Sequence, residues 1–365
     1  MTEYLVGGAV RDLVLGCTPS EFDLTFTGTG EEFLSTHPEA CKVGRSTAVF
    51  LYQGREHMPL RGNNIQEDLL ARDLTINALA LEVNGTVHCH PLALHDLQHK
   101  ILRPASAKAL ADDPGRAFRL ARFAAHFHDF TVDAEAYTQM RSPQVQEAQI
   151  FLPAERVGRE LLKALGSPKP SRFLHVLDQG KMLEPWFSEL TDADNLPAGP
   201  PQWHRGSVLE HISHVMDTVA GDPLAVWMAL CHDLGKISTP TDILPHHYGH
   251  EKRGMPAATQ LGTRLALPTR YIMAGALAAR EHMKGGTYEQ LRVGTRRDLL
   301  ISVHNAGLDK PFWALVNADS HKDLASLARQ DLHTLLQVQL PLEWHNRGKA
   351  SADKLRAMHC AALLQ

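Results

Sequence analysis

The stretch LVGGAVRD at residues 5–12 decides the fold of the N-terminal part of the chain. It reads as a short strand that turns at two glycines and enters a helix. A helix that follows such a turn presents free backbone N–H groups to phosphate, and Arg11 lies early enough in it to pair with the same group. The stretch therefore predicts a phosphate-binding turn around Gly8.

Two acidic residues follow in EFDLTFTG at residues 21–28. On a strand, alternation places the side chains of Glu21 and Asp23 on one face, where their carboxylates can share a divalent metal. Metal-dependent phosphoryl transfer uses such a pair beside a phosphate-binding turn. A solvated turn next to an exposed strand face is the alternative interpretation of these residues alone.

Outward from these stretches, the pattern changes from α/β to helical. Residues 22–27, 48–52 and 80–83 are typical of strands, whereas 69–79 has helical spacing. Helical spacing then dominates, as at 113–127, 155–165 and 172–177. The Pro/Gly-rich segment 195–206 predicts a domain boundary before a second helical block.

Two motifs place charged side chains among apolar residues. Arg72 and Asp73 lie in EDLLARDLTINALA at 67–80, where a simple ion pair on a helix surface is the common case. DDPGRAFRLARF at 112–123 opens a helix on which Arg116, Arg119 and Arg122 fall three apart. Such an arginine stripe is usually solvated, but it also suits a triphosphate or an RNA backbone.

The composition limits the classes of function. The 365 residues carry a net charge of −4, so any contact with nucleic acid must come from local basic patches. No apolar run reaches the length of about 18 residues that a membrane helix needs. The five cysteines lack CxxC spacing, and we expect reduced thiols and a cytoplasmic protein.

Histidine is unusually frequent, with 22 residues in the chain and a dense group between positions 204 and 282. His211, the adjacent His232 and Asp233, and Asp319 have side chains suited to a transition metal or Mg²⁺. Other histidines of this region, such as His214 and His247, are interpreted as surface or hydrogen-bonded residues.

Taken in order, the N-terminal motifs resemble those of the class II tRNA nucleotidyltransferases, the CCA-adding enzymes and their poly(A) polymerase relatives. The matching elements are GGxVRD at 7–12, the acids at 21 and 23, RDxTINA at 72–78, DDxxR at 112–116 and ERxxxE at 155–160. The resemblance implies that Glu21 and Asp23 are the catalytic pair and hold Mg²⁺, with Glu56 as a nearby third carboxylate. The residues implied in nucleotide binding are Gly8, Arg11, Arg72, Asp113, Arg116, Arg119 and Arg122, of which Asp113 and Arg116 face the base of CTP or ATP.

The chain departs from the family pattern at three places. Glu21 replaces the usual first aspartate, and Ala71 replaces an arginine. The segment between Glu56 and Glu67 is shorter than the flexible loop of full CCA-adding relatives, which is associated with the switch from C to A addition. The shortening resembles CC-adding enzymes.

The histidine-rich region resembles the HD domain, whose pattern is His…His-Asp…Asp. The resemblance implies a divalent metal of unspecified identity on His211, His232, Asp233 and Asp319, with His250 and His282 available to a second ion. It also implies phosphatase or 2′,3′-cyclic phosphodiesterase activity, through a metal-bound hydroxide.

We therefore predict an α+β protein. Its expected parts are a nucleotidyltransferase head with a mixed sheet at 1–105, an all-α neck and body at 106–195, an all-α HD domain at 205–325 and a helical tail at 326–365. The predicted activity adds C, as CC or CCA, to the tRNA 3′ end from CTP and ATP. The alternatives are a poly(A) polymerase, an HD phosphohydrolase whose weakened head binds RNA, and an RNA-binding protein without activity. The sequence leaves the oligomeric state open.

Overall fold

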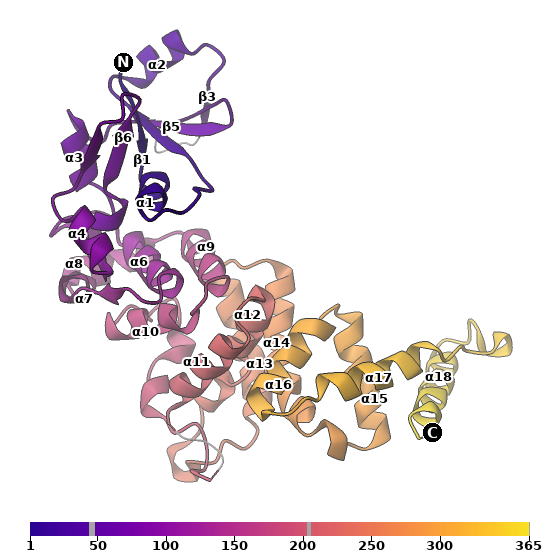
Figure 1. Ribbon diagram of the computed structural model, residues 1–365. Coiled ribbons are helices and arrows are strands. Elements are labelled where there is room, and N and C mark those ends of the chain that lie inside the picture. The colour runs from indigo at the N-terminus through magenta and orange to yellow at the C-terminus, as the bar shows by residue number, and fades with distance from the viewer. Residues whose placement is uncertain (44–47, 203–205, 365) are drawn as a thin grey trace. The chain divides into compact units, whose positions relative to one another are not determined.

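The computed structural model describes residues 1–43, 48–202 and 206–364, which divide into two compact units. The first unit contains residues 1–152 and 176–182, and the second contains the remainder. A sheet lies in the first unit and the second is helical, in agreement with the predicted α+β class (Figure 1).

The first unit alternates strands and short helices before it becomes helical. Its strands are β1 (Glu3–Val6), β2 (Asp23–Phe26), β3 (Cys41–Val43), β4 (Val49–Tyr52), β5 (Arg55–Pro59), β6 (Leu79–Glu82), β7 (Val87–Cys89), β8 (Ile101–Leu102) and β9 (Thr131–Val132). Its helices are α1 (Gly8–Val14), α2 (Gly30–Thr36), α3 (Ile65–Leu70), η1 (Thr75–Asn77), α4 (Ala93–Gln98), α5 (Ala109–Asp112), α6 (Gly115–His126), α7 (Ala134–Met140), α8 (Pro143–Ala148) and η2 (Gln149–Phe151).

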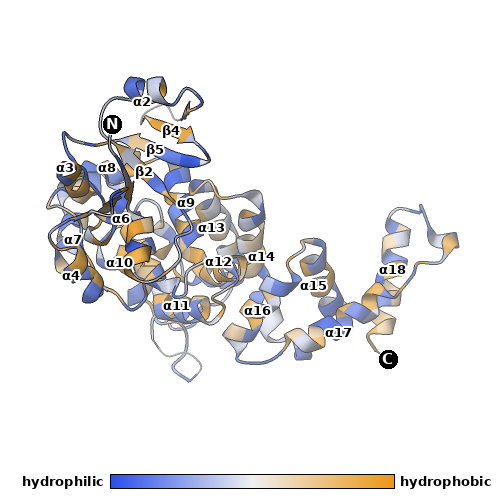
Figure 2. Ribbon diagram, turned by 45° about the horizontal axis from the view of Figure 1, so that its top comes forward, coloured by the Kyte–Doolittle hydropathy of each residue, from blue (hydrophilic) through white to orange (hydrophobic). Residues whose placement is uncertain are grey.

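The large sheet has the strand order β3-β4-β5-β2-β1-β6-β7. β2 and β5 are parallel and the other neighbours are antiparallel, which confirms the predicted mixed sheet. β4 is coloured as hydrophobic in Figure 2, whereas β5 is largely hydrophilic because it begins with Arg55 and Glu56. The polar start of β5 therefore lies beside the start of β2, where Asp23 stands.

The predicted strand, glycine turn and helix at 5–12 are confirmed as β1 and α1. The turn depends on Gly7, whose φ of +72° is a conformation that side chains with a Cβ rarely adopt. Its N–H donates to the Leu79 carbonyl of β6 at 2.9 Å, so the turn is fixed to the sheet. Asp23 pairs with Val6, the last residue of β1, and therefore lies next to the turn.

Two clusters of buried apolar side chains pack helices α3 and α2 against the sheet. Tyr4 and Val6 of β1 pack with Leu69 of α3, and Phe26 of β2 stacks on Phe33 of α2 with ring centroids 4.4 Å apart. Fully burying one such ring contributes about 2–3 kcal/mol of stability. β1 and β2, which lead to the turn and carry Asp23, are thus both packed into the core of the unit.

The helix predicted over 69–79 is wrong as a continuous element. α3 ends at Leu70, and the next residues form a turn and the short η1 before β6 begins at Leu79. Polar competition is the physical reason, because the Asp73 carboxylate accepts the N–H of Leu74 and the N–H of Thr75 donates to the Arg103 carbonyl. Both N–H groups would otherwise serve a helix.

The prediction that Glu21 and Asp23 share one strand face is also wrong. β2 begins at Asp23, because ladder pairing with Val6 and Glu56 starts only there. Glu21 precedes the strand and is exposed. Strand alternation therefore does not fix the direction of its side chain.

The second unit is built from helices. They are α9 (Ala154–Leu165), α10 (Ser171–Gln179, whose last residues belong to the first unit), η3 (Ser188–Leu190), η4 (Ala193–Asn195), α11 (Val208–Thr218), α12 (Pro223–Cys231), η5 (Leu234–Lys236), η6 (Thr241–Ile243), α13 (His250–Arg264), α14 (Thr269–Gly286), η7 (Tyr288–Gln290), α15 (Val293–Asn305), α16 (Asp309–Ser320), α17 (Ala325–Leu336), η8 (Leu342–Trp344) and α18 (Lys349–Ala362).

α12 is the central helix of the second unit. Every residue from Leu224 to Cys231 is buried, which requires neighbours on all sides, and α9, α11, α14 and α16 supply them (Figure 1). The C-terminal end of α12 is therefore a buried position, and the next two residues are His232 and Asp233. Among the described residues, no helix is long and apolar enough to cross a membrane.

Candidate functional sites

The glycine turn of the first unit is lined by a buried guanidinium. Arg11 is 8 % exposed, and its Nη2 lies 3.4 Å from the position that a Cβ on Gly8 would take. Its Nη1 donates to Oδ1 of Asn77 at 2.6 Å, and its Nε and Nη2 donate to Oδ1 of Asp12. A ring of Phe127 lies 5.0 Å from the guanidinium carbon. Arg11 thus places a fixed positive charge directly beside the turn.

Asp73 connects this arginine to α6. Its carboxylate accepts from Asn77 Nδ2 at 3.1 Å and forms a close ion pair with Arg119. Burial alone would raise the pKa of Asp73, but Arg119, Asn77 and the N–H of Leu74 outweigh burial and lower it to about 2. Asp73 is therefore ionised at neutral pH and holds Arg119 in place.

A second guanidinium, that of Arg72, also lies beside the turn. Its Nη1 lies 3.1 Å from the position of a Cβ on Gly7, and its Nε and Nη2 donate to Asp68 at 3.0 and 2.8 Å. Of the residues predicted from sequence, Arg11 and Arg72 thus lie beside the turn at Gly8, and Arg119 is linked to Arg11 through Asp73 and Asn77. An anion placed there would meet backbone N–H groups and several guanidinium groups.

The other predicted residues in and just before α6 differ in what they contact. Arg116 donates to the carbonyls of Ala71 at 2.8 Å and of Arg72 at 3.2 Å, so it supports the backbone of the Arg72 segment. Asp113 lies 3.8 Å from Arg116 and accepts the N–H at the start of α6. Arg122 lies 4.1 Å from the Phe123 ring centroid. Arg116 thus contacts the Arg72 segment, whereas the contacts of Arg122 involve the aromatic face of α6.

The acidic residues of the head have the donor type that Mg²⁺ prefers, namely carboxylate oxygen. Asp23 and Glu56 are register neighbours on parallel strands, and Glu21 lies just before β2. Within the described residues, groups of three metal-binding side chains with converging donor atoms occur only in the second unit. The first unit therefore has carboxylates at the edge of the glycine turn, where Asp23 pairs with Val6 and with Glu56.

The second unit gathers its predicted ligands around Asp233. The Nε2 of His211 lies 3.1 Å from Oδ2 of Asp233, 3.2 Å from Oδ1 of Asp319 and 3.2 Å from Nε2 of His232. The Nε2 of His232 lies 3.2 Å from the same Asp233 oxygen. These four residues come from α11, the end of α12 and α16, and they form the first group.

A second group uses the other oxygen of Asp233. The Nε2 atoms of His250 and His282 lie 3.3 and 3.5 Å from Oδ1 of Asp233, and 3.1 Å from each other. The structure thus brings together all six residues predicted for the two HD metals, with Asp233 shared between the groups.

The donor set fits metal ions. The Nδ1 atoms of His232 and His250 each face a backbone carbonyl, at 2.6 and 2.8 Å, which leaves the Nε2 lone pairs directed at Asp233. Lone pairs that face each other repel unless a proton or a cation lies between them. Both oxygens of Asp233 are buried, and the side-chain nitrogens around them are those of the four histidines and of Lys236. A cation in each group would satisfy the oxygens and the nitrogens together.

The histidines of the two groups differ in pKa because their surroundings differ. Burial alone would lower the pKa of His211, but hydrogen bonds to Asp233 and Asp319 raise it to about 9. Burial lowers the pKa of His250 to about 4. Metal-bound imidazole must be neutral, so uptake of a cation at pH 7 would release a proton from His211, and affinity should fall as the pH falls.

Lys236 is a member of this site that the sequence interpretation missed. Its Nζ lies 2.7 Å from Oδ2 of Asp233 and donates to the Ala198 carbonyl at 2.8 Å. His247, interpreted as a hydrogen-bonded residue, lies 2.8 Å from the Pro197 carbonyl and from the Thr239 hydroxyl. The Pro/Gly-rich segment is thus attached to the cluster. The signal was present in CHDLGK, where the lysine follows the His-Asp pair by three residues.

Two glycines allow the second group to form. A Cβ on Gly235 would lie 2.0 Å from the His250 carbonyl and 2.5 Å from the N of Gly254. η5 and α13 can therefore touch only through their backbones, which is what brings His250 to Asp233.

Replacing Gly235 with alanine should lower the stability of the second unit by about 2–3 kcal/mol, because backbone atoms cannot yield as a flexible side chain can. Thermal unfolding and the bound metal content would measure the effect. Gly286→Ala is the matched control, since its Cβ would meet only the Ser320 Cβ at 3.9 Å. Equal melting temperatures for the two variants would contradict this packing account.

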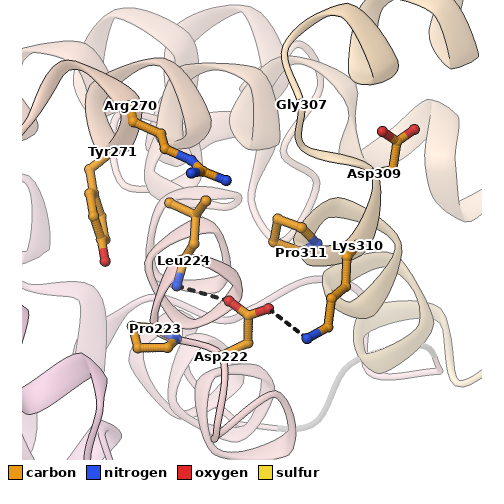
Figure 3. A pocket seen from close by; sticks show the side chains of 9 residues that line it. All are labelled: Asp222, Pro223, Leu224, Arg270, Tyr271, Gly307, Asp309, Lys310 and Pro311. Atoms are coloured by element: carbon orange, nitrogen blue, oxygen red, sulfur yellow. Dashed lines mark hydrogen bonds and ion pairs between the residues drawn. The ribbon is translucent and has the colours of Figure 1, made fainter.

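A separate cavity of about 540 Å³ lies at the N-terminal ends of α12, α14 and α16. Figure 3 shows Asp222 in contact with Lys310 and with the backbone of Leu224, and Arg270 among the other lining side chains. None of the residues predicted from sequence lines it.

Comparisons with known proteins identify the family and the fold. The Poly A polymerase head domain model matches residues 3–50. The "Multifunctional CCA protein" of Aromatoleum aromaticum is 37% identical over 308 residues, covering 77% of this chain and 74% of the relative, and that of Shewanella denitrificans is 34% identical over 343 residues, covering 86% and 80%.

Solved structures share the fold. The Thermotoga maritima CCA-adding enzyme in complex with tRNA matches with a TM-score of 0.67 at 17% identity, covering 99% of this chain and 87% of that one. A CCA-adding enzyme in complex with CTP matches with a TM-score of 0.65 at 18% identity, with the same coverage. On the identity and coverage of the curated relatives, this chain belongs to the multifunctional CCA protein family within the class II tRNA nucleotidyltransferases.

Proposed function

We propose that the chain adds the nucleotides of the CCA end to tRNA, from CTP and ATP, with the site in the head (1–105) and neck (106–195). The observation that carries this proposal is the set of guanidinium groups at the turn of Gly8, where Arg11 and Arg72 lie beside it and Arg119 is linked to Arg11, with Asp23 next to the turn. The names of the curated relatives support the same activity.

In the proposed reaction, the 3′-hydroxyl oxygen of tRNA attacks the α-phosphorus of CTP or ATP. A phosphodiester bond forms as the hydroxyl proton passes to solvent, the bond between the α-phosphorus and the oxygen that bridges to the β-phosphate breaks, and pyrophosphate leaves with that oxygen. The backbone N–H groups at Gly8 and the guanidinium groups of Arg11, Arg72 and Arg119 would bind the triphosphate and stabilise charge that develops on the leaving group. Arg122 would extend this positive surface.

Enzymes of this family generally use a divalent metal such as Mg²⁺. Asp23 and Glu21 would hold it, with Glu56 nearby. When bound, such an ion lowers the pKa of the attacking hydroxyl and neutralises charge on the triphosphate. The side chains of Asp113 and Arg116 would face the base, where a carboxylate accepts from the exocyclic amine of C or A and a guanidinium donates to ring acceptors.

Extension of a tRNA transcript that lacks CCA tests the proposal. With CTP and Mg²⁺, we expect two cytidines to be added. β5 ends at Pro59 and α3 begins at Ile65, so the connection is short, as in CC-adding relatives, and we expect the terminal A to be added more slowly than the cytidines. A transcript left unextended with both nucleotides would refute the proposal, and long A tails on unrelated RNA would identify a poly(A) polymerase.

A second activity is supported by the cluster around Asp233. We propose that the HD domain (205–325) holds one or two divalent metals, with His211, His232, Asp233 and Asp319 as the first group and His250 and His282 completing the second. Such a centre supplies a hydroxide at neutral pH that can attack a phosphate ester. Monoester and 2′,3′-cyclic phosphate substrates with a series of divalent metals would test this activity.

A further inference from the structure

Asp68 of α3 is a buried carboxylate to which the preceding roles assign no function. Its side chain is 2 % exposed, and its Oδ2 accepts hydrogen bonds from both Nε and Nη2 of Arg72. Its Oδ1 accepts the backbone N–H of Arg61 at 3.1 Å. A single carboxylate therefore ties Arg72 to the short connection between β5 and α3.

The hydrogen bonds to Asp68 leave the guanidinium of Arg72 in a defined orientation. Because Nε and Nη2 are both directed at Asp68, the planar group turns its remaining Nη1 away, and this atom is the one that lies against Gly7. A buried carboxylate is costly unless a cation compensates it, so Asp68 and Arg72 stabilise each other in this arrangement.

The connection that Asp68 anchors has a second, separate attachment. Glu67 accepts the N–H of Asn63 at 2.8 Å, and the side chain of Asn64 accepts the N–H of Glu67 at 3.0 Å. Glu67 therefore holds the same connection, but among the described residues no hydrogen bond or ion pair joins it to Arg72. Both acids of α3 thus hold the connection, but only Asp68 also orients Arg72. Comparing variants of the two acids can therefore distinguish the two effects.

We propose that Asp68 is a positioning residue for nucleotide binding. It holds the Arg72 guanidinium ready at the phosphate turn, so that CTP binds without paying for the ordering of that side chain. The inference rests on the proposed function of the turn, and it adds a residue that does not itself touch the nucleotide.

The test compares the dissociation constant of CTP with Mg²⁺ and the maximal rate of tRNA extension in wild type and Asp68→Asn. The dissociation constant should rise about tenfold, the size expected when a charge-assisted hydrogen bond is lost, while the maximal rate changes less. Glu67→Gln is the matched control and should change the dissociation constant by less than about twofold. Asp68→Glu keeps the charge and should raise the dissociation constant about threefold.

A double-mutant cycle distinguishes orientation of Arg72 from a general effect of Asp68 on the structure. In an Arg72→Met background, Asp68→Asn should weaken CTP binding no further, because its effect acts through the arginine. Additive losses, an equal loss for Glu67→Gln, or unchanged affinity in both Asp68 variants would overturn the positioning role alone. A wild-type protein that neither binds CTP nor extends tRNA would overturn this role together with the proposed function.

Discussion

Replacing Asp23 with asparagine should reduce the rate of cytidine addition by at least about 1,000-fold, which corresponds to about 4 kcal/mol of transition-state stabilisation. Asparagine keeps the shape of the side chain but removes the negative charge that a divalent cation requires. Asp23 is the first residue of β2, and its backbone pairs with Val6 and Glu56, so the strand itself should be unaffected. Single-turnover extension of a tRNA transcript measures the loss.

The matched control is Glu31→Gln, which neutralises an exposed carboxylate on α2 in the same unit. It should leave the rate within about twofold of wild type. Glu21→Asp tests the departure from the family pattern, and we expect it to retain extension. An Asp23→Asn protein that extends tRNA at the wild-type rate would contradict the assignment of this acid.

Replacing Asp233 with asparagine should weaken metal binding in the second unit by more than about 100-fold, because one carboxylate faces both groups of histidines. Hydrolysis of phosphate esters should fall with it. Metal content after dialysis and the rate of 2′,3′-cyclic phosphate hydrolysis measure the two effects. Extension of tRNA should persist, since the proposed transferase residues lie in the first unit.

His214→Ala supplies the control for the second unit. This exposed histidine lies on α11 with His211, one turn along the helix, and has no place in either metal group. Its replacement should leave metal content and hydrolysis unchanged. If Asp233→Asn behaved like His214→Ala in both measurements, the metal assignment of the cluster would be wrong.

The parts that the sequence predicted well are those fixed by local chemistry. A strand followed by Gly7 and Gly8 has few alternatives, because the positive φ of Gly7 is accessible mainly to glycine. α6 follows in the same way from its apolar spacing and from Pro114 at its start. The ordered motifs then identified the family.

The parts that failed depend on partners distant in sequence. The helix predicted across Asp73 is interrupted because the N–H of Thr75 bonds to the Arg103 carbonyl and the carbonyl of Arg72 accepts from Arg116, both of them distant in sequence. Strand pairing alone determines that β2 begins at Asp23 and excludes Glu21. The sharing of Asp233 by two histidine groups likewise requires the contact of η5 with α13, which the spacing of histidines along the chain does not encode.

The most direct measurement is the position of Mn²⁺ in crystals of the protein grown with CTP, located by anomalous scattering. The account predicts a manganese ion coordinated by the carboxylate of Asp23, with the triphosphate against Gly8 and the Nη1 of Arg72. Manganese bound elsewhere, with Asp23 making no contact to it and the turn at Gly8 empty, would contradict the account.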